Sequence, residues 1–124
     1  MYRYRTTNDY TSTSEKAIKH LPKLGFITEI RGYRYIDKHR VAEEAVLVKG
    51  ENGTARFSGL TWGYGGTGPH GLIKLLIAVG LSEQDARSIS LLPRSSKIGT
   101  DWKLTRDINY GWTTPTCEVI PNPS

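Results

Sequence analysis

Residues 63–71 are Gly63-Tyr64-Gly65-Gly66-Thr67-Gly68-Pro69-His70-Gly71, and the rest of this 124-residue chain is organised around them. Five of the nine residues are glycine, which suits a backbone at positive φ or in close approach to another group. The next residues are apolar at the spacing of a helix face, from Leu72 to Val79. Pro69 suits a first helical turn and Gly80 suits a helix end. The stretch therefore predicts a glycine-rich loop that leads into a helix.

The residues before the loop predict a β-meander. Residues 26–36 are rich in β-branched and aromatic side chains and predict a strand, in which Gly32 marks a bulge or the close approach of another backbone. Residues 45–49 and 54–60 predict two more strands, joined by the hairpin signal Asn52-Gly53. Residues 41–44 suit a helical turn, with Glu43 and Glu44 in solvent.

The two ends of the chain add further elements. Within residues 1–11, tyrosine alternates with arginine at Tyr2-Arg3-Tyr4-Arg5, and Tyr10 follows; this predicts an edge strand with the two residue types on opposite faces. Ser12 and Glu15 form a capping box for a short helix that Pro22 and Gly25 end. Ser82 suits the N-cap of a later helix, and residues 101–108 predict a closing strand. We expect one α+β domain over residues 1–114, a small antiparallel sheet packed with two to three helices, and an extended tail over residues 115–124.

Composition favours a soluble binding protein. Hydrophobic residues make up 37% and charged residues 23% of the chain, and no apolar run is long enough to span a bilayer. The first residues lack the apolar segment of a signal peptide. Cys117 is the single cysteine, which excludes an internal disulfide and favours the cytoplasm. The net charge of +5 favours anionic partners.

The glycine-rich loop is the predicted ligand site. A helix amino end has unpaired N–H groups and partial positive charge, which suit a phosphate. Backbone donors would come from the glycines, a hydroxyl from Thr67, charge from arginine, histidine or lysine, and stacking faces from Trp62 and Tyr64. The alternative is a turn that joins a strand to a helix, with Trp62 in the core. The predicted ligand-binding residues are Arg34, Arg56, Trp62, Tyr64, Gly65, Gly66, Thr67, Gly68, His70 and Lys74.

Catalytic and metal-binding patterns are scarce. The glycines match neither a P-loop, which needs Lys-Ser or Lys-Thr, nor a dinucleotide fingerprint in a βαβ unit. His20, His39 and His70 are scattered, and no metal-ligating cluster is present. Cys117, in a proline-rich tail, is expected to be an idle thiol. We therefore expect no catalytic residues, no metal and no cofactor.

Residues 57–69 are Phe57-Ser58-Gly59-Leu60-Thr61-Trp62-Gly63-Tyr64-Gly65-Gly66-Thr67-Gly68-Pro69. With the apolar helix that follows, they resemble a family of small proteins of bacteria and their phages, with a Trp-Gly-Tyr-Gly-Gly-Ser/Thr-Gly-Pro signature after a short β-meander. The resemblance covers roughly residues 30–90, and His70-Gly71 departs from the small polar pair expected there. It implies a phage or mobile-element origin and the cytoplasm of an infected bacterial host, but no assigned activity. In kind alone, the chain is similar to phage anti-defence sponges that sequester nucleotide signals.

These observations leave several functions open. The leading hypothesis is a non-enzymatic protein that sequesters a phosphorylated nucleotide, such as a cyclic nucleotide or a cyclic ADP-ribose isomer. Its site would lie in one chain or between the protomers of a homo-oligomer. The alternatives are an inhibitor that binds a host defence enzyme through tyrosine and tryptophan anchors and a nucleic-acid-binding protein that uses the amino-terminal run Tyr2-Arg3-Tyr4-Arg5 and the tail. A nucleotide-processing enzyme has the least support.

Overall fold

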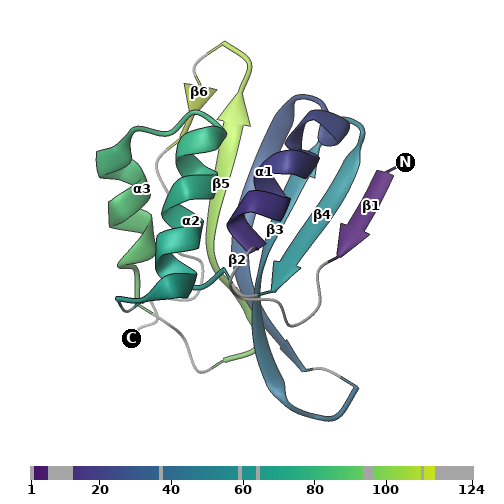
Figure 1. The fold of residues 1–124 in the computed structure, drawn as a ribbon, viewed down its shortest axis with the longest axis vertical. Helices are drawn as coiled ribbons and strands as arrows, with labels where there is room; N and C mark the ends of the chain where they lie inside the picture. Colours follow the sequence, from purple (N-terminus) through teal and green to yellow (C-terminus); the bar gives the residue numbers. More distant parts are fainter. Residues whose placement is uncertain are drawn as a thin grey trace.

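The computed structural model describes residues 2–5, 13–36, 38–58, 60–63, 65–93, 97–109 and 111–113. It is one six-stranded, mostly antiparallel sheet with three helices, so the predicted α+β class is confirmed (Figure 1). In chain order the elements are β1 (Tyr2–Arg5), α1 (Thr13–Leu24), β2 (Ile27–Ile36), β3 (Ala42–Gly50), β4 (Gly53–Ser58), α2 (Thr67–Ala78), α3 (Glu83–Ser90), β5 (Gly99–Asp107) and β6 (Gly111–Trp112).

The predicted meander forms the middle of the sheet. Strands β2, β3 and β4 pair antiparallel in sequence order, and β5 pairs antiparallel with the other edge of β2. The strand order is β1-β4-β3-β2-β5-β6, with β1 parallel to β4 at one edge. The turn at Glu51 and Asn52 joins β3 to β4, as the hairpin signal predicts.

One predicted element is wrong, and the predicted end of the first helix is correct for Gly25 but not for Pro22. Residues 42–44 belong to β3 and not to a helical turn, because pairing with β2 places Glu44 opposite Arg34. Helix α1 runs through Pro22 to Leu24. A proline in the last turn costs one backbone hydrogen bond there, and the helix ends only before Gly25, which has φ 73°.

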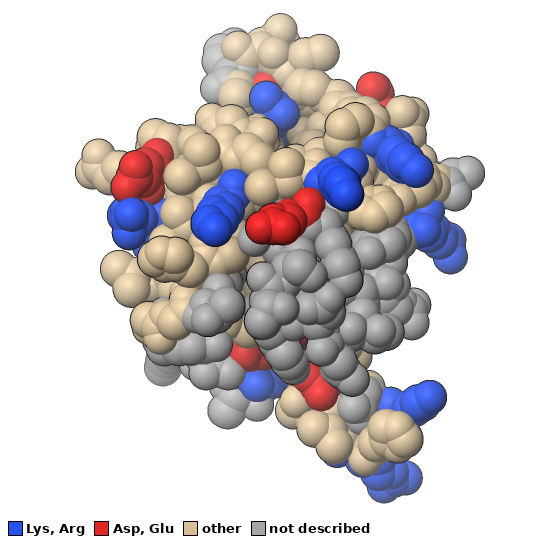
Figure 2. All heavy atoms as spheres, viewed as in Figure 1, with Lys and Arg blue, Asp and Glu red and all other residues tan. Residues whose placement is uncertain are grey.

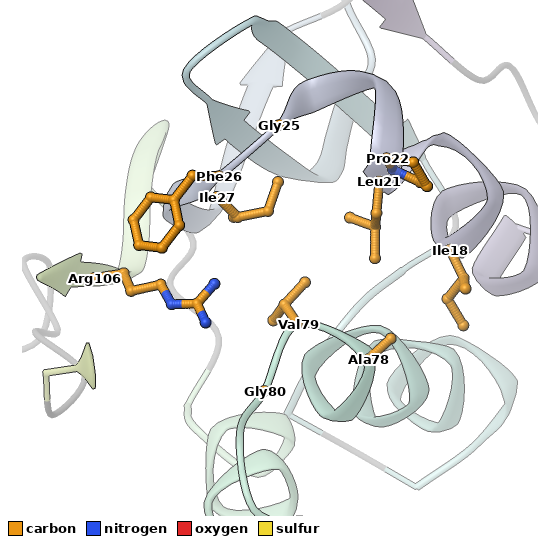
Figure 3. A pocket seen from close by; sticks show the side chains of 10 residues that line it. All are labelled: Ile18, Leu21, Pro22, Gly25, Phe26, Ile27, Ala78, Val79, Gly80 and Arg106. Atoms are coloured by element: carbon orange, nitrogen blue, oxygen red, sulfur yellow. The ribbon is translucent and has the colours of Figure 1, made fainter. Parts of the chain in front are cut away.

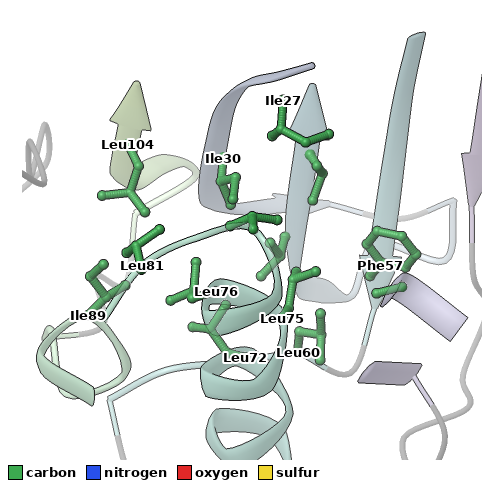
Figure 4. Close-up of a cluster of buried hydrophobic side chains, with 14 of the residues drawn as sticks. Ile27, Ile30, Phe57, Leu60, Leu72, Leu75, Leu76, Leu81, Ile89 and Leu104 are labelled. Carbon is green, nitrogen blue, oxygen red and sulfur yellow. The ribbon is translucent and has the colours of Figure 1, made fainter. Parts of the chain in front are cut away.

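The core lies between the helices and one face of the sheet (Figure 4). Strand residues on this face alternate with outward residues, as in any strand with one buried face. Helix α2 contributes Leu72, Leu75 and Leu76, all with 0% exposure. The buried strand residues that meet the helices are Ile30, Val46, Val48, Ala55, Phe57, Trp102 and Leu104.

The edge strand β1 has the two faces that its sequence predicts. Tyr2 packs against the core, and its hydroxyl hydrogen-bonds Nδ1 of His20 on α1. Arg3 is exposed on the opposite face. Burial lowers the pKa of His20, and the nearby charges of Lys23 and Lys19 lower it further.

Trp112 belongs to the fold and packs against the core. It lies in β6, and its indole N–H donates to the carbonyl oxygen of Val79 at 3.1 Å. This bond fastens the end of the sheet to the carboxyl end of α2. The predicted tail, residues 115–124, lies outside the described residues.

Candidate functional site

The amino end of α2 is exposed, as the loop prediction requires. Gly66 is the N-cap residue, with φ 153°, and no side chain among the described residues caps the helix there. Gly65, Gly66, His70 and Lys74 are all exposed. Because His70 and Lys74 are four residues apart, they share one side of α2. This end of the helix therefore combines an uncapped amino terminus with two basic side chains.

Trp62 is not available to stack on a ligand at this loop. Its side chain has 0% exposure and its indole N–H donates to Oδ2 of Asp101 at 3.0 Å. Its ring also meets that of Trp102 edge-on, at 5.7 Å between centroids. The predicted stacking role is therefore wrong, and the alternative of a core tryptophan is confirmed. Tyr64 and the Thr67 side chain lie outside the described residues, although Thr67 and Gly68 open α2.

Arg34 and Arg56 do not join the loop in one site, because they lie on opposite faces of the sheet. Arg34 faces the helices and pairs with Glu44 at 2.7 Å, with 14% and 7% of the two side chains exposed. Arg56 faces away from the helices, with its guanidinium 4.6 Å from the ring centroid of Tyr35. The prediction that the Glu44 carboxylate is solvated is also wrong, because this side chain is buried. A buried carboxylate requires a partner, which here is Arg34.

The face of the sheet opposite the helices, called the open face below, carries a row of basic residues. The pairing register of the strands determines which residues lie in this row. Arg31 on β2 pairs with Lys103 on β5 and with Leu47 on β3. Leu47 pairs in turn with Arg56 on β4. Strands β2, β4 and β5 therefore each contribute a basic residue to this row.

Two tyrosines lie beside the basic row. Tyr33 and Tyr35 follow Arg31 at alternate positions of β2, so they point to the same face. Their rings are 5.7 Å apart between centroids, and Arg56 lies over Tyr35. The open face therefore presents aromatic rings and guanidinium groups side by side.

Cations outnumber carboxylates on the described part of the open face. Arg3 and Lys49 flank the basic row on the side away from the tyrosines. Glu29 and Glu43 are the carboxylates in the rows from Glu29 to Tyr35, and Glu29 accepts a 2.8 Å hydrogen bond from Nε of Arg31. No ion pair involves Arg56 in the described part of the chain. The face therefore keeps a positive balance.

The sequence contained a signal for the open face that the loop-centred prediction passed over. Arg31, Tyr33 and Tyr35 alternate within the strongest predicted strand, so they had to share a face. The sequence places Arg56 on the strand that leads to the loop and so predicts a role for it there. In the structure, the β3–β4 register pairs Arg56 with Leu47, and the Arg56 guanidinium lies over the ring of Tyr35.

The helix side of the molecule lacks such a concentration. Figure 2 shows basic side chains scattered over this side, several of them beside acidic ones. On α3, for example, Arg87 pairs with Glu83 at 2.8 Å. Among the described residues, histidine, cysteine and carboxylate side chains form no group of three or more that could hold a metal ion. None of the described helices is long and apolar enough to cross a membrane.

Comparison with known proteins adds no relative. The resemblance of residues 57–69 to a bacterial and phage family therefore stays a prediction. No protein-family model matches the chain, and no curated protein or solved structure matches it either.

Proposed function

We propose that the protein binds single-stranded nucleic acid on its open face, without catalysis. One observation carries the proposal: Lys103, Arg31 and Arg56 lie in one row across the sheet, with Tyr33 and Tyr35 beside them. The three described helices all pack on the other face (Figure 1).

The dimensions of the row suit a nucleic-acid backbone. Neighbouring strands lie about 4.8 Å apart, so the three spacings from β5 to β4 cover about 14 Å. This length exceeds the spacing of neighbouring phosphates along a nucleic-acid strand, so more than one phosphate can meet the row. Arginine suits phosphate because its planar group donates two parallel hydrogen bonds.

The tyrosines favour a single strand over a duplex. Bases stack on aromatic side chains only when they are free of their own stack, and each such contact contributes about 1–3 kcal/mol. A duplex offers the open face its phosphates alone. The partial exposure of Tyr33 and Tyr35 leaves ring surface for such contacts.

Fluorescence anisotropy with labelled oligonucleotides tests this proposal. We expect an oligothymidylate and an oligouridylate of about 15 nucleotides to bind at least about tenfold more tightly than a duplex of the same length. The affinity should fall steeply as salt is raised. Equal affinity for the duplex would show that the tyrosines do not stack on bases, and would contradict a preference for single strands. Absence of binding at low salt would contradict the proposal as a whole.

A second candidate function rests on the amino end of α2. The exposed glycines and the uncapped helix support binding of a phosphorylated nucleotide, with charge from His70 and Lys74. This is the sequestration hypothesis, with its site limited to the exposed glycines, His70 and Lys74. Under this hypothesis the protein holds its ligand without changing it chemically.

Thermal-shift measurements with cyclic dinucleotides, cyclic trinucleotides, ADP-ribose and its cyclic isomers test this second candidate. A ligand at about 100 times its Kd adds about 2.7 kcal/mol of stability. We expect His70→Gln with Lys74→Gln to abolish the shift without changing the Tm of the free protein, because both side chains are exposed. Recovery of a chemically altered ligand after heating would contradict sequestration, as would a shift that this double variant retains.

A further inference from the structure

A pocket of about 600 Å³ lies on the helix side of the sheet, between the carboxyl ends of α1 and α2 (Figure 3). Its volume is within the range of small-molecule sites. It is separate from the open face and from the amino end of α2. The described residues that line it are Ile18, Leu21, Pro22, Gly25, Phe26, Ile27, Ala78, Val79, Gly80 and Arg106.

Arg106 is the one charged residue among those lining residues, and the others are apolar or glycine. Its guanidinium points from β5 into the space between Phe26 and Val79 (Figure 3). Ile18, with 38% exposure, and the exposed Ala78 extend the apolar surface outward. An apolar pocket with a single cation suits a ligand with an apolar body and one negative charge.

Aromatic rings hold Arg106 in place without neutralising it. Its guanidinium carbon is 4.7 Å from the ring centroid of Phe26 and 5.3 Å from that of Trp112. Trp112 is itself fixed by its hydrogen bond to the carbonyl oxygen of Val79. No ion pair involves Arg106 in the described part of the chain. Its fork of N–H donors is therefore ordered before any ligand arrives, which reduces the entropy lost on binding.

The position of Arg106 near the end of α2 has a structural benefit as well. A cation is favourable at a helix carboxyl end, and a Cβ added to Gly80 would lie 3.7 Å from the Arg106 guanidinium. That benefit explains a basic residue at this point. The interaction of a cation with the helix end does not, however, require an apolar cavity beside Arg106.

We propose that this pocket binds a small amphiphile, an alkyl or aryl chain that ends in a carboxylate. The carboxylate pairs with the Arg106 guanidinium, and the chain lies against Leu21, Ile27 and Val79. The pairing of the charge with the cation, and of the chain with the apolar walls, selects this class over neutral or cationic amphiphiles.

Decanoate is a suitable probe, with decanol as the uncharged control. We expect saturable binding of one decanoate per chain by calorimetry, with a shift of the Trp112 indole N–H resonance by NMR. The resonances of the buried Trp62 and Trp102 should move much less. Arg106→Gln should weaken decanoate binding by at least about tenfold, the range for hydrogen bonds to charged groups, and Arg106→Lys should weaken it less.

Ala78 provides a second test that leaves Arg106 and the core untouched, because Ala78 is exposed beside the pocket. Ala78→Glu should weaken decanoate more than decanol, because its carboxylate repels only the charged ligand, whereas the matched Ala78→Gln should weaken the two ligands by the same factor. The proposal is overturned if Arg106→Gln binds decanoate as tightly as the wild type. It is also overturned if decanol binds as well as decanoate, or if the Trp112 resonance does not move at saturation.

Discussion

Replacing Arg31, Arg56 and Lys103 together by glutamine should weaken binding of an oligothymidylate by roughly 50-fold near 0.15 M salt. Each cation that meets a phosphate of a single strand adds about 0.7 to the slope of log affinity against log salt concentration. Loss of all three should therefore lower this slope by about 2. Removal of Arg31 also leaves the Glu29 carboxylate without the partner it has at 2.8 Å. Anisotropy titrations at several salt concentrations measure both effects.

The matched control removes the same charge from the helix side. Lys19 and Lys23 are exposed on α1, and Arg87 is exposed on α3. The glutamine triple variant at these positions should bind within a few-fold of the wild type. If the two triple variants lose affinity equally, net charge and not the open face governs binding.

Valine at position 32 should lower the free energy of unfolding by about 3 kcal/mol, the upper part of the usual range for overpacking. Trp102 is the Cα partner of Gly32 across β2 and β5, and its indole covers the glycine. A Cβ at Gly32 would fall on this ring, 2.8 Å from its Cζ2 atom. Trp102 has no room to move, because it is fully buried and meets Trp62 edge-on. Urea denaturation measures the loss, and the Tm should fall by roughly 10 °C.

Gly65→Val is the control for this substitution. A Cβ at Gly65 would meet nothing within 4 Å, and the residue is exposed. Valine there should change the free energy of unfolding by no more than about 0.5 kcal/mol. A Gly32→Val protein as stable as the Gly65→Val protein would contradict the described contact of Trp102 with β2.

The sequence predicts the strands and helices well where local signals are strong. The Asn52-Gly53 turn, the Ser82 cap and the alternation in residues 27–36 all specify structure within a few residues, and each element is present. The Ser82 side chain accepts from the backbone N–H of Asp85 at 3.1 Å, as a cap should.

The errors occur where distant residues decide the outcome. Glu44 looked solvated because its partner Arg34 is ten residues away and meets it only through the β2–β3 register. Trp62 looked available because it adjoins the glycines, but Asp101 and Trp102 on β5 enclose it. The same long-range register assembles the basic row from three separate strands. Composition alone indicates only that anionic partners are favoured.

The hypothesis of an inhibitor that binds a host enzyme stays a prediction. An open face with tyrosine and arginine also has the composition of protein interfaces. The basic row favours a polyanion over a typical protein surface, because five cations face two carboxylates on the described rows from Glu29 to Tyr35. This charge balance decides our preference for nucleic acid.

The most direct test of the proposed function is an NMR titration of the backbone amides with an oligothymidylate. We predict the largest shifts on β2, β3, β4 and β5 at outward positions, among them Arg31, Tyr33, Leu47, Arg56 and Lys103. Amides on the exposed sides of α1 and α3 should stay unchanged. Shifts confined to Gly65, Gly66 and His70 would place the contact at the amino end of α2 and contradict the proposal, as would a spectrum that does not change.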